Sequence, residues 1–176
     1  MNKVIIIGCP GSGKSTFARS LHEKTQLPLV YLDMLFWNAD RSTVTREVFD
    51  QRLKEAMDSE RWIIDGNYSR TMEQRLAACD TVFFLDYSPE VCLESIRNRR
   101  GQARPDMPWI EREDDADYGE FLAFVSNFTT DRRPQILRLL EKYPDKTVHH
   151  FTSREDAQHY LNEIGTNQEV SYGISG

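Results

Sequence analysis

The stretch VIIIGCPGSGKST, residues 4–16, decides the fold of this chain. Its first four residues are all apolar and β-branched, which is typical of a strand buried on both faces of a parallel sheet. The glycines that follow let the backbone curl so that successive N–H groups point at one anion. A helix is predicted from about Lys14 to Lys24, and its positive end adds to that attraction. The spelling matches the phosphate-binding motif G-x-x-x-x-G-K-[ST] at Gly8, Gly13, Lys14 and Ser15.

Further strands and helices alternate along the rest of the chain. Short apolar runs predict strands at residues 27–33, 61–65, 80–88 and 146–151. Helical spacing of apolar residues predicts helices at 45–59 and at 118–143, the latter with a break at Pro134. N-cap signals at Ser88 and Ser153 predict two more, at 89–100 and 153–165. Such alternation is typical of a parallel sheet with helices on both faces. We therefore expect a three-layer α/β fold with a five-stranded parallel sheet, in one domain spanning residues 1–176 with a frayed tail at 166–176.

The bulk composition is that of an ordinary globular protein. The 176 residues are 39% hydrophobic and 28% charged, with a formal net charge of −6. An acidic chain is a poor candidate for wrapping DNA, because such affinity comes from neutralising phosphates, so nucleic acid is not the expected partner. No stretch approaches the ~18 apolar residues of a membrane span, and the three cysteines have no metal-binding or redox spacing. The sequence predicts a cytoplasmic protein with reduced thiols and no membrane partner.

The glycine-rich loop is the expected nucleotide site. In loops of this kind the lysine, here Lys14, reaches the β and γ phosphates, and the hydroxyl that follows it, here Ser15, ligates Mg²⁺. The loop therefore predicts a nucleoside triphosphate with Mg²⁺ and does not distinguish ATP from GTP. A glycine-rich turn that only joins a strand to a helix is the alternative. The candidate cofactor-binding residues are Gly8, Gly11, Ser12, Gly13, Lys14, Ser15 and Thr16.

The chain after residue 100 bears on whether a phosphoryl group is transferred or hydrolysed. A GTPase needs base-reading motifs of the N-K-x-D type, which we do not find, and a motor ATPase usually needs a longer chain. Residues 101–117 are polar, broken by prolines and flanked by arginines, which is typical of a lid that excludes water during phosphoryl transfer. We place a lid at about residues 101–133, with the acidic run 111–117 as its solvated face.

An arginine cluster accompanies the predicted lid. Its members are Arg97, Arg99, Arg100, Arg104, Arg132 and Arg133. Closure of a lid would bring arginines onto the charge that develops on the transferring group. A solvated basic helix end is the alternative for each of them, because cations favour helix C-termini. Together with Lys14, the predicted catalytic residues of this region are Arg97, Arg100 and Arg132.

Several stretches resemble one group of nucleotide-binding proteins. The glycine-rich loop, WIIDGNYSR (62–70), FLDYSP (84–89) and the lid are together similar to the adenylate-kinase-like P-loop kinases. More narrowly, YLDMLFW (31–37), WIIDGNY and RNRRGQARPDMP (97–108) resemble bacterial DNA topology modulation proteins, which are themselves similar to nucleotide kinases. The resemblance extends from residue 3 to about residue 164. It implies a P-loop NTPase fold with strand order 2-3-1-4-5, ATP with Mg²⁺, and an acceptor bound across the carboxyl ends of the strands.

Asp33 and Asp65 each end a predicted strand, so both are expected to point into the crevice where open α/β sheets bind ligands. The segment DGNYSR is similar to the D-G-[FY]-P-R segment of adenylate kinases. This implies that Asp65 holds Mg²⁺ through water and that Arg70, one residue late in the match, binds phosphate. For either aspartate the alternative is a side chain that caps a turn.

Asp33 also bears on the identity of the acceptor. A phosphate acceptor needs arginines, whereas a hydroxyl acceptor gains from a carboxylate that takes its proton. In shikimate- and gluconate-type kinases an aspartate of this region contacts the substrate hydroxyl, while in adenylate kinases D-M-L-R supplies an arginine where this chain has Phe36. We predict Asp33 as a catalytic and substrate-binding residue, with Trp37 able to stack on a base or sugar or else to fill the core.

Several functions remain open at this level. The expected one is an ATP-dependent phosphotransferase, similar to nucleoside-monophosphate kinases, that acts on a small-molecule phosphate acceptor. The alternatives are a hydroxyl kinase of the shikimate or gluconate type, a DNA-binding regulator of topology, and a nucleotide sensor with little turnover. The sequence leaves the acceptor and the oligomeric state undetermined.

Overall fold

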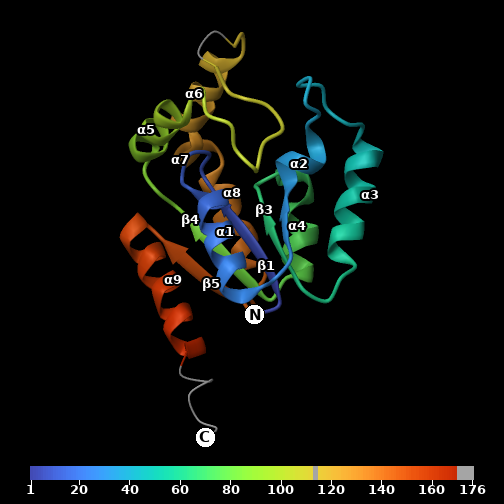
Figure 1. Ribbon diagram of the computed structural model, residues 1–176, viewed down its shortest axis with the longest axis vertical. Coiled ribbons are helices and arrows are strands. Elements are labelled where there is room, and N and C mark those ends of the chain that lie inside the picture. The colour runs from blue at the N-terminus through green and yellow to red at the C-terminus, as the bar shows by residue number, and fades with distance from the viewer. Residues whose placement is uncertain (113–114, 170–176) are drawn as a thin grey trace, which may run out of the picture.

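The computed structural model describes residues 1–112 and 115–169, with side-chain surroundings described up to Ile164. Within this range five parallel strands form one sheet in the order β2-β3-β1-β4-β5 (Figure 1). Both the parallel sheet and the strand order agree with the expectation from the sequence. The strands are β1 (Lys3–Gly8), β2 (Leu29–Tyr31), β3 (Trp62–Asp65), β4 (Thr81–Leu85) and β5 (Thr147–Phe151).

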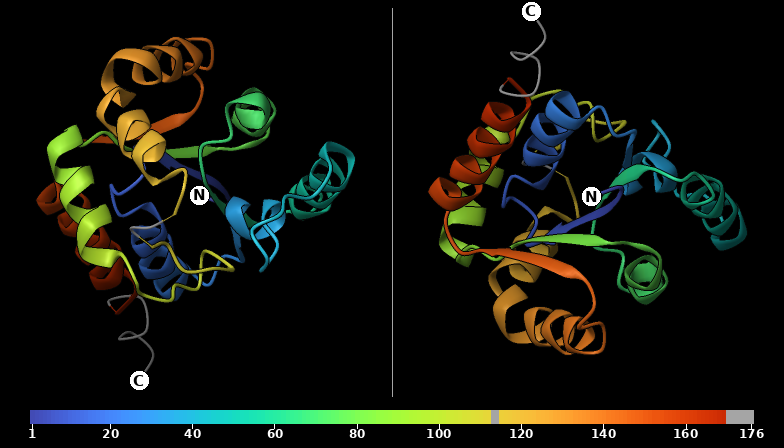
Figure 2. Two further views of the ribbon diagram at one scale, coloured as in Figure 1. Left: turned by 90° about the horizontal axis from the view of Figure 1, so that it is seen from above. Right: turned by 90° about the horizontal axis from the view of Figure 1, so that it is seen from below.

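Helices connect the strands and cover both faces of the sheet. They are α1 (Lys14–Thr25), α2 (Leu32–Phe36), α3 (Arg46–Met57), α4 (Ser69–Ala78), α5 (Pro89–Arg99), α6 (Tyr118–Ser126), α7 (Phe128–Asp131), α8 (Arg133–Glu141) and α9 (Arg154–Glu169). In Figure 2, α1 and α9 lie on one face of the sheet, and α4 and α8 lie on the other. None of the helices in the described ranges has the length and apolar character needed to cross a bilayer.

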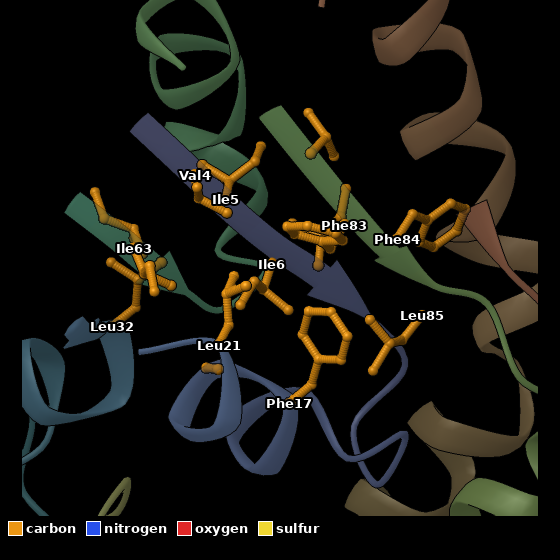
Figure 3. Packing of buried hydrophobic residues seen from close by; sticks show 14 of the residues in the cluster. Val4, Ile5, Ile6, Phe17, Leu21, Leu32, Ile63, Phe83, Phe84 and Leu85 are labelled. Carbon is orange, nitrogen blue, oxygen red and sulfur yellow. The ribbon is translucent and has the colours of Figure 1, made fainter. Parts of the chain in front are cut away.

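The central strand β1 is apolar because protein covers it on both faces. Its residues Val4–Ile7 have no solvent-exposed surface. Phe17 and Leu21, one turn apart on α1, pack against the strand beside Phe83 of β4 (Figure 3). The rings of Phe17 and Phe83 lie 4.9 Å apart between centroids. This burial anchors the strand, and with it the start of the glycine-rich loop.

The structure corrects the end of the second strand. The strand predicted for residues 27–33 ends at Tyr31, and Asp33 lies in the first turn of α2. The backbone turns there, Leu32 is fully buried against Gly66, and the Asp33 carbonyl accepts the hydrogen bond that ends the helix, from the Trp37 N–H at 2.9 Å. Asp33 is therefore presented by a helix, although it still lies at the carboxyl edge of the sheet.

Other helix boundaries also differ from the expectation. The predicted helix over 118–143 is interrupted at Asn127 and Arg132 instead of at Pro134, because this proline lies in the first turn of α8 where it costs no hydrogen bond. Ser153 caps α9 through the Asp156 N–H at 3.1 Å, whereas Ser88 makes no side-chain cap bond. The last helix continues past residue 165 to Glu169, and the remaining part of the predicted tail, 170–176, lies outside the described residues.

Candidate functional site

The loop between β1 and α1 approaches neighbouring backbone closely at two glycines. Gly8 has a φ of 147°, and a Cβ on it would lie 2.2 Å from the Leu85 carbonyl oxygen. Gly11 has a φ of 85°, and its Cβ would lie 2.3 Å from the Cys92 carbonyl oxygen of α5. Any larger residue would have to displace backbone at either position. Gly8 is required by the sequence motif, whereas the need for glycine at position 11 comes from its close contact with α5.

Lys14, Ser15 and Asp65 meet beside this loop. The Lys14 Nζ donates to the Cys9 carbonyl oxygen at 3.0 Å, and the Ser15 Oγ donates to Asp65 Oδ2 at 2.7 Å. Asp65 ends β3 and is buried, and its Oδ1 finds no hydrogen-bond partner among the described residues. The buried Ser12 Oγ is unpartnered in the same sense. Buried polar atoms are normally hydrogen-bonded, so these two oxygens mark places that a ligand would complete.

Two side chains that the sequence analysis did not select hold the segment after β3. Asn67 brackets Gly8: its Oδ1 accepts from the Gly8 N–H at 3.0 Å and its Nδ2 donates to the Gly8 carbonyl at 2.6 Å. Arg75 of α4 is fully buried and donates to the carbonyls of Gly66 at 2.8 Å, Tyr68 at 3.2 Å and Asn67. Burial lowers the pKa of Arg75 to about 10, so it remains charged at neutral pH. These contacts hold Asp65 against the glycine-rich loop.

One cavity of about 840 Å³ opens at the carboxyl edge of the sheet. Its walls come from the glycine-rich loop, α1, α2, the segment after β3, α5, α6, α9 and the segment between α5 and α6 (residues 100–112 and 115–117, the α5–α6 segment). Ligands of open α/β sheets bind at this position, and the volume suits a small molecule. The predicted site residues that line it are Gly11, Ser12, Gly13, Lys14, Ser15, Thr16, Asp33, Trp37 and Asp65, whereas Gly8 lies behind them.

Asp33 lies in this cavity beside Tyr68. The Tyr68 hydroxyl donates to Asp33 Oδ1 at 2.7 Å. The carboxyl is partly exposed to the cavity and otherwise surrounded by protein, so desolvation raises its pKa, and the charge of Asp106 adds to the rise. The Tyr68 hydroxyl and Lys14 act in the opposite direction. Tyr68 itself has a φ of 36°, a left-handed conformation that is uncommon outside glycine.

Aromatic side chains line the same end of the cavity. Trp37 and Trp109 of the α5–α6 segment meet edge to face, with ring centroids 5.7 Å apart. The Trp109 Nε1 is buried and has no hydrogen-bond partner among the described residues. Phe36 packs against Trp37, Phe49 and Tyr68 and does not line the cavity.

Two arginines that line the cavity, Arg99 and Arg104, are bonded to carboxylates of the α5–α6 segment. Arg99 makes two hydrogen bonds to Glu111, at 2.8 and 3.0 Å, and Arg104 lies 3.4 Å from Glu111 and 3.2 Å from Asp106. Both carboxylates are buried. The expectation that the acidic run 111–117 is a solvated face is therefore wrong for Glu111, because this residue pairs with two arginines.

The arginines predicted to be catalytic do not line the cavity in this structure. Arg97 is exposed on α5. The Arg100 guanidinium lies over the Tyr118 ring at 5.7 Å, and the Arg132 guanidinium lies over the Phe124 ring at 5.5 Å. A catalytic role for these three residues stays a prediction that would require the region to move.

Arg70 also lies outside the large cavity. It forms an ion pair with Asp50 of α3, with one hydrogen bond of 3.0 Å, and its guanidinium lies 5.9 Å from the centre of the Phe49 ring. Arg70 lines a separate, smaller hollow together with Phe36 and Arg46. Its predicted contact with substrate phosphate stays a prediction.

Comparisons with known proteins support the fold and leave the family open. No family model matches the chain. Two curated adenylate kinases from Thermotoga neapolitana are each 27% identical over 99 residues, which is 54% of this chain and 43% of theirs. The chain thus matches less than half the length of these relatives.

Two solved shikimate kinases share the architecture over nearly the whole chain. The enzyme from Bacteroides thetaiotaomicron has a TM-score of 0.53 and 18% identity, with 94% of this chain and 97% of the other covered. The enzyme from Acinetobacter baumannii, in complex with shikimate, has a TM-score of 0.58 and 15% identity, with 99% and 96% covered. The chain has a P-loop NTPase α/β fold. At these identities the likeness concerns the fold alone.

The buried Asp65 of the P-loop site gives a stability prediction. Burial raises the pKa of Asp65 from its ordinary value of 3.8 to about 6, while Lys14 and the Ser15 hydroxyl oppose the rise. Because the folded-state pKa is the higher one, the stabilising contribution of the carboxyl is complete below pH 3.8 and is lost as the pH rises through 6. At pH 8 the ionised group costs the unliganded protein about 3 kcal/mol. We expect Asp65→Asn to raise the free energy of unfolding at pH 8 by roughly 1–3 kcal/mol.

Urea unfolding of the unliganded protein at pH 5 and pH 8 checks this expectation. The gain from Asp65→Asn should be larger at pH 8 than at pH 5. Asp58→Asn, an exposed position that ends α3, serves as the control and should change stability little at either pH. A loss of stability in Asp65→Asn at pH 8 would contradict the assigned cost of the buried charge.

Proposed function

We propose that this chain is an ATP-dependent phosphotransferase that moves the γ-phosphoryl group of Mg-ATP to a small-molecule acceptor. The observation that carries the proposal is that Lys14, Ser15 and Asp65 share one cavity with Asp33 and Trp37. A hydrolase needs only water beside the γ-phosphate, whereas a transferase also needs groups that hold and orient an acceptor. Asp33 and Trp37 are suited to hold an acceptor, and they line the same cavity as Lys14, Ser15 and Asp65.

The donor side of the cavity fits a nucleotide triphosphate with Mg²⁺. The P-loop N–H groups and Lys14 would hold the phosphates. The Ser15 hydroxyl and the unpartnered Asp65 Oδ1 are the oxygen donors that Mg²⁺ prefers, with Asp65 acting through water. When bound, the ion neutralises negative charge on the transferring phosphoryl group. Among the described residues no three His, Cys, Asp or Glu side chains gather to hold a metal by themselves, which suits an ion that keeps several waters.

The acceptor side would use Asp33. Its carboxylate, bonded to the Tyr68 hydroxyl, can orient an acceptor and, for a hydroxyl acceptor, take the proton. We assign the chain of about 101–133 the role of a lid within a single domain of residues 1–176. Arg99 and Arg104 line the cavity, and we propose that they exchange Glu111 and Asp106 for the phosphates of the nucleotide when this lid closes and excludes water.

The similar proteins support phosphoryl transfer as the reaction class, and they leave the type of acceptor open. The matched adenylate kinases favour a nucleotide, and the solved shikimate kinases are compatible with a hydroxyl compound. The resemblance to DNA topology modulation proteins suggests a regulator instead. A regulator would not need the acceptor groups that line the cavity, so we prefer the phosphotransferase.

Calorimetry and an ADP-release assay test the proposal. We expect the protein to bind Mg-ATP and to release ADP at least about tenfold faster when a suitable small-molecule acceptor is added, with the phosphorylated acceptor found by mass spectrometry. If the folded protein takes up no ATP, the proposal is wrong. Duplex DNA binding that falls steeply with salt and does not depend on ATP, without acceptor turnover, would favour the regulator.

A further inference from the structure

Three carboxylates line the cavity, two at its acceptor end and one, Asp65, on its donor side beside Ser15. They are Asp33 of α2, Asp106 of the α5–α6 segment and Asp65 of β3. Their charges act on one another: Asp106 raises the pKa of both other carboxyls, and Asp33 raises that of Asp65. The Asp106 side chain is only 6% exposed, so water screens its charge poorly. This end of the cavity is therefore unfavourable for a further anion.

The neighbouring cations are already engaged. Arg104 lies 3.2 Å from Asp106, and Arg19 of α1 lies 3.8 Å from the same carboxylate. Arg99 is bonded to Glu111. The remaining cations of the described cavity wall are Lys14, in the P-loop, and Arg154, which donates to the Ser95 Oγ between α9 and α5. An anionic acceptor beside Arg19, Arg99 or Arg104 would have to displace a carboxylate before it gained a partner.

Among the described residues, no cation reaches the cavity from the positions at the end of α2 and the start of α4, where an arginine for an anionic acceptor was expected or sought. Phe36 occupies the interior between Phe49 and Tyr68, and Arg70 is paired with Asp50 at the separate hollow. Neither Phe36 nor Arg70 lines the large cavity. This side of the acceptor end is therefore walled by Tyr68 and Trp37 and adds no positive charge.

The same end offers groups that suit a ring carrying hydroxyls. The edge-to-face pair of Trp37 and Trp109 presents aromatic surface to the cavity. The buried Trp109 Nε1 lacks a hydrogen-bond partner among the described residues, and a ligand oxygen would satisfy this donor. Asp33 can accept from a ligand hydroxyl, because a carboxylate oxygen takes more than the single bond from Tyr68.

We propose that the acceptor is an uncharged, ring-bearing alcohol, such as a nucleoside or a neutral sugar, and not a phosphate monoester or a carboxylic acid. This inference rests on the proposed phosphotransferase function. The acceptor oxygen attacks the γ-phosphorus, a new O–P bond forms, and the bond from that phosphorus to the β–γ bridging oxygen breaks to release ADP. The hydroxyl proton passes to the Asp33 carboxylate and then to solvent, so the step needs no further reactant.

Matched pairs of acceptors test the inference in the intact protein with Mg-ATP. Each pair keeps the ring and differs in one charged group: a nucleoside against its 3′-monophosphate, which retains the 5′-hydroxyl, and glucose against glucuronate. We expect kcat/KM for the uncharged member of at least one pair to exceed that of its partner by about a hundredfold. Preference for the charged members would overturn the inference. A protein that binds ATP but phosphorylates none of the uncharged compounds would also overturn the inference. A protein that binds no ATP would instead contradict the proposed phosphotransferase function.

A charge variant tests the physical reason. Asp106→Asn removes one carboxylate, leaves Arg104 with Glu111 alone and releases Arg19 from its ion pair, so it should reduce the selectivity for uncharged over charged acceptors by about tenfold. Glu120→Gln, an exposed change of the same charge on α6, should leave the ratio unchanged. Affinity for Mg-ATP, measured in parallel, reports whether each variant is folded. An unchanged ratio in a folded Asp106→Asn protein would show that this carboxylate does not exclude anions.

Discussion

Lys14→Ala is expected to lower acceptor-dependent ADP formation by roughly a thousandfold while the protein remains folded. Lys14 is the cation of the expected phosphate-binding loop, where it would stabilise the negative charge that develops on the leaving oxygen and the phosphate oxygens in the transition state. Among the described residues its ammonium group makes one hydrogen bond, to the Cys9 carbonyl oxygen at 3.0 Å. The free energy of unfolding should therefore change by about 1 kcal/mol or less.

Lys24→Ala is the matched control for this variant. Lys24 lies in the last turn of the same helix, and it does not line the cavity. The same change of side chain and charge there should leave turnover within about twofold of the unmodified protein. Steady-state kinetics and urea unfolding of both variants separate catalysis from stability. Turnover by Lys14→Ala close to that of the control would contradict the assignment of the phosphate site.

Local signals explain why the P-loop region could be predicted from the sequence. The apolar run, the glycines and the helix that follows are contiguous, so β1, the loop and α1 need no knowledge of the rest of the chain. The helix α4 was missed because its buried face includes Thr71 and the charged Arg75 beside Met72 and Leu76. A charged residue on the buried face interrupts the apolar spacing that would predict a helix. Arg75 can be buried because it bonds backbone carbonyls of the segment that precedes its helix, and these contacts appear only in the folded protein.

The acceptor side was less predictable because it depends on pairing between distant segments. The sequence shows an arginine cluster, but it does not show that Glu111 and Asp106 would hold Arg99 and Arg104 at the cavity wall. The strand pattern through residues 27–33 likewise concealed α2, so Asp33 was expected at a strand end. The bond between Asp33 and Tyr68 joins residues 35 positions apart. Tertiary contacts of this kind leave no periodic signal in the chain.

Gly11→Ala is expected to destabilise the protein far more than Gly13→Ala, although both glycines lie in the same loop. Their φ angles are nearly equal, 85° and 89°, so the strain of placing a side chain in this backbone region is about the same, roughly 1–2 kcal/mol. The surroundings differ, because a Cβ on Gly11 would lie 2.3 Å from the Cys92 carbonyl oxygen and 3.0 Å from Ile96, while a Cβ on Gly13 would meet nothing within 4 Å.

The comparison of the two variants isolates the contact between the P-loop and α5. Forcing backbone apart should add about 1–3 kcal/mol to the cost at Gly11, so urea unfolding of the unliganded protein should give a clearly lower midpoint for Gly11→Ala. Gly13→Ala should instead retain most of the stability and report on nucleotide binding, because its new methyl group enters the open cavity. Equal losses in the two variants would mean that α5 yields to the added methyl group. In that case packing against Cys92 would not be what holds the P-loop in its curled conformation.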